Sequence, residues 1–337
     1  MRATIKDIAK ISGMSVSTVS RVLSNHPHVS QRAQERVTQA AQAIGYIPNS
    51  AARSLVSKQR RLIGLVVPEM ENPFYNEIIS GVELTAARHG FGTVLSCKMG
   101  NVSQEDDSIS KLVELGVDGV IHSGLLNDEE VNKKLLKWKV PSVLLGRVVH
   151  DLDLSYVVFN DRDSAWQGTQ HLLRLGHRRI AFLFGKPTSD SSVRKLEGYR
   201  AALADAGISF SEELVAAGGL TFEGGKAAAA QLLARTHFTA VMAGNDMMAL
   251  GARDCFLERG IRIPQDVSLV GIDDIFWSSL QLVGLTTVRV PKFEMGRRCC
   301  EILLKQIADE TCSHEQIVLT GELICRNSCQ RPQGGVV

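Results

Sequence analysis

Residues 13–25, "GMSVSTVSRVLSN", combine an apolar stripe with a face of small hydroxyl groups. Val19, Val22 and Leu23 recur at helical spacing, so they share one side of a short helix that Ser15 can cap. Serines and one arginine gather on the opposite side, at positions 17, 20, 21 and 24. Because small hydroxyl side chains let a helix backbone come close to another molecule, this stretch predicts a helix that lies against a partner.

Helices on both sides of this stretch complete a three-helix unit. Thr4 and Asp7 form a capping box that opens the first helix, and Gly13 ends it. A third helix begins at Ser30 and stops at Gly45. Three short helices with a glycine in the first turn predict a helix-turn-helix unit, and its second helix is then the one that enters the major groove of DNA.

Two side chains of the second helix suit base recognition. Arg21 offers a forked donor that matches O6 and N7 of guanine, and Val16 can contact a thymine methyl group. The alternative is a solvated polar face on a small helical domain, and the spacing alone does not decide between the two.

The charge distribution favours DNA. Residues 1–61 contain ten Lys and Arg and two acidic residues, a net charge of +8. The whole chain has 38 basic and 36 acidic residues, so residues 62–337 carry −6. A basic segment on an acidic body is typical of a nucleic-acid-binding module, because neutralised phosphates release counterions.

Composition excludes several classes of protein. A length of 337 residues with 44% hydrophobic residues indicates about two globular domains. No stretch approaches the roughly 20 apolar residues of a membrane span, and the N-terminus lacks an apolar signal core, so we expect a cytoplasmic protein. Seven cysteines without a C-x-x-C pair predict neither a disulfide framework nor a metal site. Glycine-rich segments at 90–92 and 219–226 lack the spacing of a phosphate loop, so we expect no cofactor and no enzyme.

A basic linker follows the three helices. Residues 46–61, "YIPNSAARSLVSKQRR", hold a proline, a possible cap at Asn49 and one or two helical turns. So short a helix is unstable alone, so we expect it to form only when DNA or a partner chain supports it. Leu55 within it is either incidental packing or a wedge that enters the minor groove.

From Leu62 onward, apolar runs of strand length alternate with segments of helix length. The expected strands are 62–68, 93–97, 119–124, 142–146, 156–159, 179–185, 240–246, 267–273 and 286–290. Repeated βα units of this kind predict an α/β fold with parallel sheets that helices cover on both faces. About 275 residues of this pattern make two lobes.

Polar side chains follow these strands, at the edge where parallel sheets bind ligands. Carboxylates, an amide and an arginine beside aromatic rings suit a polyhydroxylated ligand, whose hydroxyl groups need partners on all sides. For each single Asp or Asn, ordinary helix capping is the alternative. The convergence of several favours a site. The candidates are Asn72, Pro73, Phe74, Asn160, Asp161, Asp163, Arg194, Phe222, Asn245, Asp246, Asp273 and Asp274.

Over its full length the chain resembles the LacI/GalR family of bacterial transcription regulators. The resemblance is carried by "ATIKDIAKISGMSVSTVSRVLSNHPHVSQRAQERV", "IGYIPNSAARSL", "IGLVVPEMENPFY", "GVDGVI", "HLLRLGHRRIAFL", "GYRAALADAGI", "AGNDMMALGA", "IPQDVSLVGIDD" and "LTTVRVPKFEMG". It implies a homodimer that reads a pseudo-palindromic operator in double-stranded DNA, with residues 49–56 as a hinge helix. It also implies that a small effector contacts Phe74, Asp163, Arg194, Phe222, Asn245 and Asp273.

The resemblance implies a domain organisation as well. We expect a helix-turn-helix headpiece at 1–46, a hinge helix and linker at 47–61, and an effector-binding and dimerisation body at 62–330. The body is expected to resemble periplasmic sugar-binding proteins of type I, with three crossovers near 158–162, 288–292 and 315–320. Its N-lobe takes about 62–159 and 291–317, and its C-lobe about 160–290 and 318–330.

The expected function is that of a repressor of a carbohydrate-utilisation operon, controlled allosterically by a sugar or sugar derivative. Alternatives are a non-sugar effector such as a nucleobase, or a sugar-binding protein without a regulatory role. The residues expected to contact DNA are Thr4, Ser15, Val16, Ser17, Thr18, Ser20, Arg21, Asn25, Ser30, Tyr46, Asn49, Ala52 and Leu55.

The chain departs from the family pattern in three places. Asn160-Asp161 stands where many members have Asp-Asn, and Ser164 stands where they have Gly, so the rim of the pocket is expected to differ. The tail, "ICRNSCQRPQGGVV", has no leucine heptads, which argues against a tetramerising extension.

Overall fold

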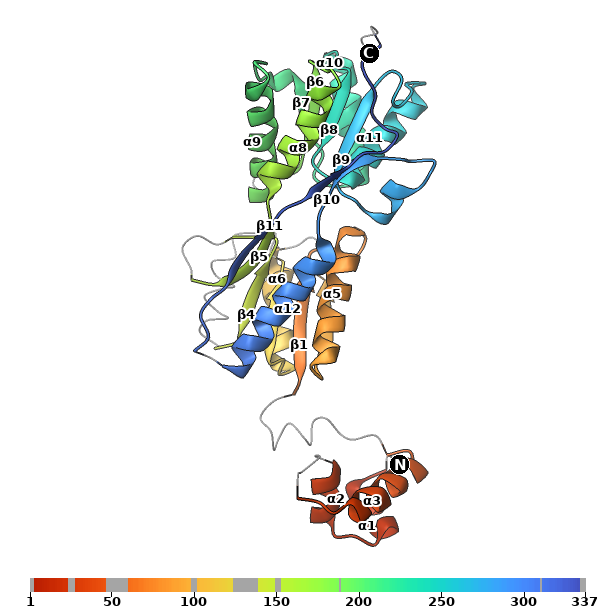
Figure 1. Cartoon of the computed structure of the whole chain (residues 1–337), viewed down its shortest axis with the longest axis vertical. Coiled ribbons are helices and arrows are strands. Elements are labelled where there is room, and N and C mark those ends of the chain that lie inside the picture. The colour runs from red at the N-terminus through yellow and green to blue at the C-terminus, as the bar shows by residue number, and fades with distance from the viewer. Residues whose placement is uncertain are drawn as a thin grey trace. The chain divides into compact units, whose positions relative to one another are not determined.

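The computed structural model (Figure 1) describes residues 3–23, 28–46, 60–97, 102–123, 139–148, 153–187, 189–309 and 311–333. The chain divides into two compact units, Met1–Arg60 and Arg61–Val337, which we call the headpiece unit and the body. Among the described helices, none has the length and apolar character needed to cross a membrane.

In the described part of the headpiece unit, three helices surround a small apolar core. They are α1 (Ile5–Ser12), α2 (Val16–Leu23) and α3 (Gln31–Ala43). Ile8, Val19 and Val37 are fully buried between them. Both hydrogen bonds of the capping box at Thr4 are present, and Gly13 ends α1 with a left-handed φ of 65° that favours glycine. The predicted helix-turn-helix unit is therefore confirmed.

The body contains two six-stranded sheets. The first has the order β11-β5-β4-β3-β1-β2, and the second β12-β10-β9-β8-β6-β7. The strands of the first sheet are β1 (Leu62–Val67), β2 (Gly92–Cys97), β3 (Gly119–His122), β4 (Ser142–Leu145), β5 (Ser155–Phe159) and β11 (Gln316–Leu319). Those of the second are β6 (Ile180–Phe184), β7 (Val215–Ala217), β8 (Ala240–Ala243), β9 (Ser268–Asp273), β10 (Thr286–Arg289) and β12 (Glu322–Ile324).

The sheets follow the predicted α/β pattern with one exception. All pairings are parallel except that of β10 with β12, which is antiparallel. After β11, only Thr320 and Gly321 connect the chain to β12 in the second sheet. Parallel neighbours need a long crossover, usually a helix, and this two-residue connection has none, so β12 can pair antiparallel. β11 continues to Leu319, two residues past the lobe boundary that we placed at 317.

Helices cover both faces of each sheet. In the first lobe, α5 (Phe74–Arg88) and α12 (Lys292–Ala308) lie side by side on one face, and α6 (Val102–Glu114) covers the other (Figure 1). In the second lobe, α8 (Asp161–Arg174) and α9 (Asp190–Asp205) pack on one face, and α10 (Phe222–Arg235) and α11 (Asp246–Glu258) on the other. Short 3-10 helices lie at Glu212–Leu214 and Phe276–Ser279.

The chain crosses between the lobes three times, from β5 to α8, from β10 to α12 and from β11 to β12. The first and third crossovers are joined, because the N–H of Asn160 donates to the carbonyl of Leu319 at 2.8 Å. The carboxyl ends of β5, β10 and β11 lead directly into the crossovers.

Candidate functional site

The polar face of α2 is exposed as expected. Ser15, Val16, Ser17, Ser20 and Arg21 are all exposed, and Val16 keeps 48% of its surface. An apolar side chain left this open on a polar helix face is suited to an apolar feature of a partner, such as a thymine methyl group.

Hydroxyl groups cluster at the start of this helix. The hydroxyl of Ser15 lies 2.8 Å from those of Ser17 and Thr18, and it accepts the N–H of Thr18 at 3.1 Å. Ser15 therefore caps α2 and also orients two hydroxyl groups on the face that is predicted to contact DNA.

The other residues expected to contact DNA have different surroundings. Thr4 is exposed but donates its hydroxyl proton to Asp7 at 2.7 Å, a hydrogen bond that lowers the pKa of the Asp7 carboxyl. Ser30 is exposed and caps α3, whereas Tyr46 is half-buried against the headpiece core. Asn25, Asn49, Ala52 and Leu55 lie outside the described residues, as does the predicted hinge helix.

In the body, the candidate effector site begins with Asp273 at the end of β9. This residue is only 4% exposed and has a positive φ of 125°. Among the described residues, none donates a hydrogen bond to its carboxylate, and burial raises its pKa to about 8. A buried carboxyl without a protein donor is one that a bound ligand can satisfy.

A buried ion pair lies near Asp273. Lys195 Nζ is 3.3 Å from Asp161 Oδ1, and the Ser191 hydroxyl donates to the same oxygen at 2.8 Å. The ammonium also lies 5.9 Å from the centre of the Phe159 ring. Burial raises the pKa of Asp161, and the charge of Lys195 opposes that rise. The Lys195 charge acts on Asp273 in the same sense.

Arg194, the predicted cation of the site, lies in different surroundings. Its Nε is 3.0 Å from Asp190 Oδ2, and its side chain is 37% exposed. The buried cation beside Asp161 is the next residue, Lys195. The helical spacing of the sequence could have identified Lys195 as buried, because Lys195 lies on the same buried stripe of α9 as Tyr199 and Ala202. Effector contact by Arg194 remains a prediction.

The start of α5 supplies aromatic rings on the other lobe. The N–H of Phe74 donates to Asn72 Oδ1 at 3.1 Å, which fixes the first turn. The Phe74 ring meets the Tyr75 ring edge-on, with centroids 5.2 Å apart. Burial raises the pKa of Tyr75, and the negative charge of Asp273 adds to the rise. Tyr75, which the sequence analysis did not select, therefore lies within electrostatic range of Asp273 across the two lobes.

Three of the expected effector contacts are not joined to this cluster. Asn245 is buried and uses both ends of its amide, since it accepts from the N–H of Met248 at 2.9 Å and donates to the carbonyl of Leu220 at 3.0 Å. Asp163 accepts from Gln167 at 2.6 Å, and Phe222 is the half-buried first residue of α10. Within the described part of the chain, no hydrogen bond or ion pair connects these three to Asp273, so helix capping accounts for Asn245.

Across the described ranges, no cluster of three His, Cys, Asp or Glu side chains could hold a metal ion. The charged groups near Asp273 include the Lys195–Asp161 pair, which belongs to the same lobe, and Lys292.

Comparison with known proteins agrees with this architecture. The family model of bacterial regulatory proteins of the lacI family matches residues 4–49, and that of periplasmic binding proteins and the sugar-binding domain of the LacI family matches residues 60–327. The chain is 33% identical over 332 residues to the HTH-type transcriptional regulator GalR of Escherichia coli K12, covering 98% of this chain and 96% of that protein.

Solved structures give the same result. The lac repressor dimer bound to operator and the anti-inducer ONPF superposes with a TM-score of 0.88 at 28% identity, covering 98% of this chain and 100% of that one. The transcriptional regulator CelR, in its cellobiose complex, has a TM-score of 0.75 at 33% identity and covers 97% and 100%. These relatives are transcriptional regulators rather than enzymes. This chain therefore belongs to the LacI family of bacterial regulatory proteins.

Proposed function

We propose that this protein is a cytoplasmic repressor of a carbohydrate-utilisation operon and that a sugar-like effector controls its affinity for operator DNA. The observation that carries the proposal is the pairing of two features in one chain. One is an exposed hydroxyl-rich recognition helix in a segment of net charge +8, and the other is a buried carboxyl, Asp273, without a protein donor.

Operator binding as a homodimer is supported by the headpiece. A single recognition helix covers about half of a pseudo-palindromic site, so two headpieces are needed to read both halves. The lac repressor of similar fold was solved as a dimer on operator DNA. We infer that Val16, Ser17 and Arg21 contact base edges, and that the surrounding basic residues contact phosphates.

A sugar is the effector that the body suits best. Asp273 and Asp161 offer carboxyl groups, Lys195 offers donors, and the Phe74–Tyr75 pair offers aromatic surface for the C–H face of a sugar ring. CelR, of similar sequence and fold, was solved with cellobiose. A nucleobase also has N–H donors and a flat face, and the experiment below separates the two classes.

The mechanism is linkage between two sites. An effector that closes the cleft changes how the N-lobes of a dimer meet, and so alters whether the hinge segments at 49–56 can form on DNA. Such coupling is typically worth about 1 to 3 kcal/mol, and each ligand shifts the affinity of the other by the same factor.

A thermal-shift screen of the full chain tests the effector class. The panel contains D-galactose, D-ribose, cellobiose, their phosphates, adenine and guanine. A true effector raises the melting temperature with concentration, and it must also change operator affinity in a fluorescence anisotropy titration. If only adenine or guanine acts in both assays, the sugar assignment is wrong. If no compound alters operator affinity, the regulatory assignment is wrong.

Site variants then locate the effector. Asp273→Asn should abolish the melting-temperature shift and leave operator affinity without effector close to wild type. Asp254→Asn is the matched control, because Asp254 forms a surface ion pair with Lys226 at 2.7 Å on the outer side of α11. An unchanged shift in Asp273→Asn places the effector elsewhere.

A further inference from the structure

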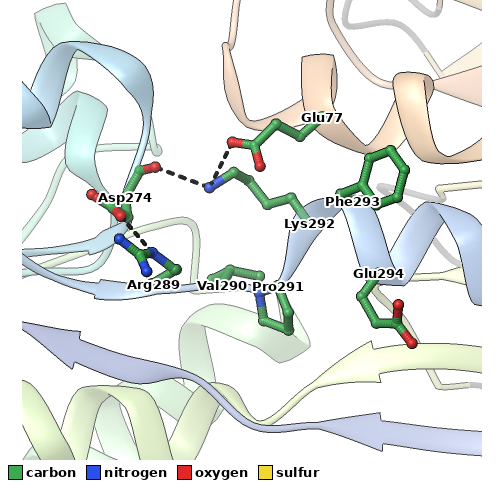
Figure 2. A pocket seen from close by; sticks show the side chains of 8 residues that line it. All are labelled: Glu77, Asp274, Arg289, Val290, Pro291, Lys292, Phe293 and Glu294. Atoms are coloured by element: carbon green, nitrogen blue, oxygen red, sulfur yellow. Dashed lines mark hydrogen bonds and ion pairs between the residues drawn. The ribbon is translucent and has the colours of Figure 1, made fainter.

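A buried lysine connects the two lobes at the second crossover. Lys292, the first residue of α12, is 2% exposed. Its ammonium donates to the carbonyl of Asp273 at 2.5 Å. It also donates to the carbonyl of Asp274 at 3.0 Å and lies 3.2 Å from Glu77 Oε1, as Figure 2 shows. An ammonium group has three donors, so the three acceptors use all of them. Two acceptors belong to the second lobe and the third to α5 of the first.

The turn that Lys292 holds is strained. Asp273 and Asp274 both have positive φ, 125° and 53°, in a region that non-glycine residues rarely adopt. Each such residue costs about 1 to 3 kcal/mol, so the surrounding contacts must fix the conformation. The side chain of Asp274 is held by Arg289 at 2.8 Å and Arg326 at 2.6 Å. The backbone of Asp273 is held by Lys292, and this backbone sets the direction of the Asp273 carboxyl.

Glu77 provides the connection to α5. It lies three residues after Phe74, on the helix whose first two residues are the aromatic pair of the site. Its side chain is 54% exposed at a groove between the lobes that Arg289 and Lys292 also line (Figure 2). The neighbouring carboxylate, Glu294, is occupied by Arg297 at 2.5 Å and Arg298 at 2.8 Å. Glu77 is therefore the acidic partner of Lys292, and its open surroundings let it move with α5.

We propose that Lys292 is a positioning residue that couples the Asp273 site to helix α5 through Glu77. A ligand that donates to the Asp273 carboxyl changes the turn at 273–274, the carbonyls of that turn move relative to the ammonium, and Glu77 follows. Removal of Lys292 disturbs both the site and the coupling, whereas removal of the Glu77 charge disturbs the coupling alone. This inference rests on the proposed effector function, and its first test needs no effector.

The first test measures hydrogen exchange of the full chain without any ligand. In Lys292→Met, which keeps the apolar stem and loses the donors, amide exchange in the peptide that contains Asp274 and Ile275 should rise at least tenfold. Lys305→Met is the matched control on the same helix, because Lys305 forms only a surface ion pair with Glu315. Equal exchange in Lys292→Met and wild type overturns the positioning role. Lys292→Gln keeps one donor group, so its exchange rate should lie between those of wild type and Lys292→Met. This variant also provides the test if Lys292→Met does not fold.

The second test separates coupling from binding. It uses as probe whichever of D-galactose, D-ribose and cellobiose gives the largest melting-temperature shift. Glu77→Gln should bind the probe within twofold of wild type, and should bind operator without probe within twofold. The ratio of operator affinities with and without probe should fall at least fivefold. Glu83→Gln, an exposed residue of the same helix, should keep the wild-type ratio.

The outcomes distinguish the two proposals. A full wild-type ratio in Glu77→Gln overturns the coupling role of Lys292 even when the effector function holds. If no sugar changes operator affinity in wild type, the proposed function fails, and the hydrogen-exchange result still decides whether Lys292 fixes the turn.

Discussion

Thr287 Oγ1 donates a hydrogen bond of 2.6 Å to Asp246 Oδ1, and both side chains are fully buried. The other oxygen of Asp246 accepts from the Ser278 hydroxyl at 2.6 Å and from the N–H of Ile275 at 3.0 Å. One carboxylate therefore joins the start of α11, β10 and the segment after β9. It fixes the segment that follows the turn at 273–274, and Lys292 binds the carbonyls of the turn itself.

Loss of this carboxylate should be costly. Asp246→Ala leaves two hydroxyl groups and one N–H buried without an acceptor, at about 1 to 3 kcal/mol each. We expect the free energy of unfolding to fall by about 3 kcal/mol or more in urea denaturation. Asp254→Ala, which removes a surface ion pair, should cost less than about 1 kcal/mol. Similar losses in the two variants would contradict a central role for Asp246.

The buried carboxyl of Asp273 predicts a pH dependence of stability. Burial raises its pKa from 3.8 to about 8, with Lys195 and Lys292 opposing the shift and Asp246 and Asp161 adding to it. Between these values the folded protein binds more protons than the unfolded chain, so rising pH lowers the free energy of unfolding. Asp273→Asn cannot titrate. Relative to this variant, the free energy of unfolding of wild type should fall by at least about 1 kcal/mol between pH 5 and pH 8.

Urea denaturation of both proteins at several pH values measures this difference. Carboxyls with lowered pKa, such as Asp266 and Glu213, change the stability only under more acidic conditions. Both proteins contain them, so their effects cancel in the difference between wild type and Asp273→Asn. A difference that stays constant from pH 5 to pH 8 would show that the Asp273 carboxyl is ionised throughout.

Neighbouring basic residues of α9 should behave differently on substitution. Lys195→Met leaves Asp161 buried with Ser191 as its remaining donor, and breaking a buried pair in this way costs about 3 to 5 kcal/mol. Arg194→Ala removes a half-exposed pair with Asp190 and should cost less than about 1 kcal/mol. Thermal and urea unfolding test both values. If Arg194 contacts the effector, Arg194→Ala loses the effector response although its stability is unchanged.

The sequence predicted the sheets better than their edges. The apolar run at β1 identifies a buried strand, because both faces of the strand are covered by helices. Ile63, Leu65 and Val67 pack on one layer of helices, and Val66 packs on the other. Strands β7 and β12 have three residues each, too few for a periodic pattern, and the antiparallel pairing of β12 depends on residues distant in the sequence. Local patterns do not contain that information.

The site shows a similar limit. Asp273 was predicted from its place after a strand, and it lies at the centre of the cluster. Lys195, which lies beside Asp161, was not among the predicted residues, although the helical period places it on the buried face of α9. Asn245 caps α11, and its contact with an effector stays a prediction. Whether a polar residue after a strand caps a helix or faces a ligand depends on which donors lie nearby, and only the fold brings those together.

Operator binding should depend steeply on salt, because the net charge of +8 over residues 1–61 implies several phosphate contacts. Each contact contributes about −0.9 to the slope of log K against log salt concentration. Removing one phosphate-contacting charge, for example by Lys6→Gln, should reduce the steepness of this slope by about one. Val16→Ala should leave the slope unchanged but weaken discrimination between operator sequences. Fluorescence anisotropy at several salt concentrations, with specific and scrambled operators, measures both effects. A flat salt dependence would contradict the assignment of the headpiece, and a loss of discrimination in Lys6→Gln with none in Val16→Ala would show that α2 is not the element that reads the bases.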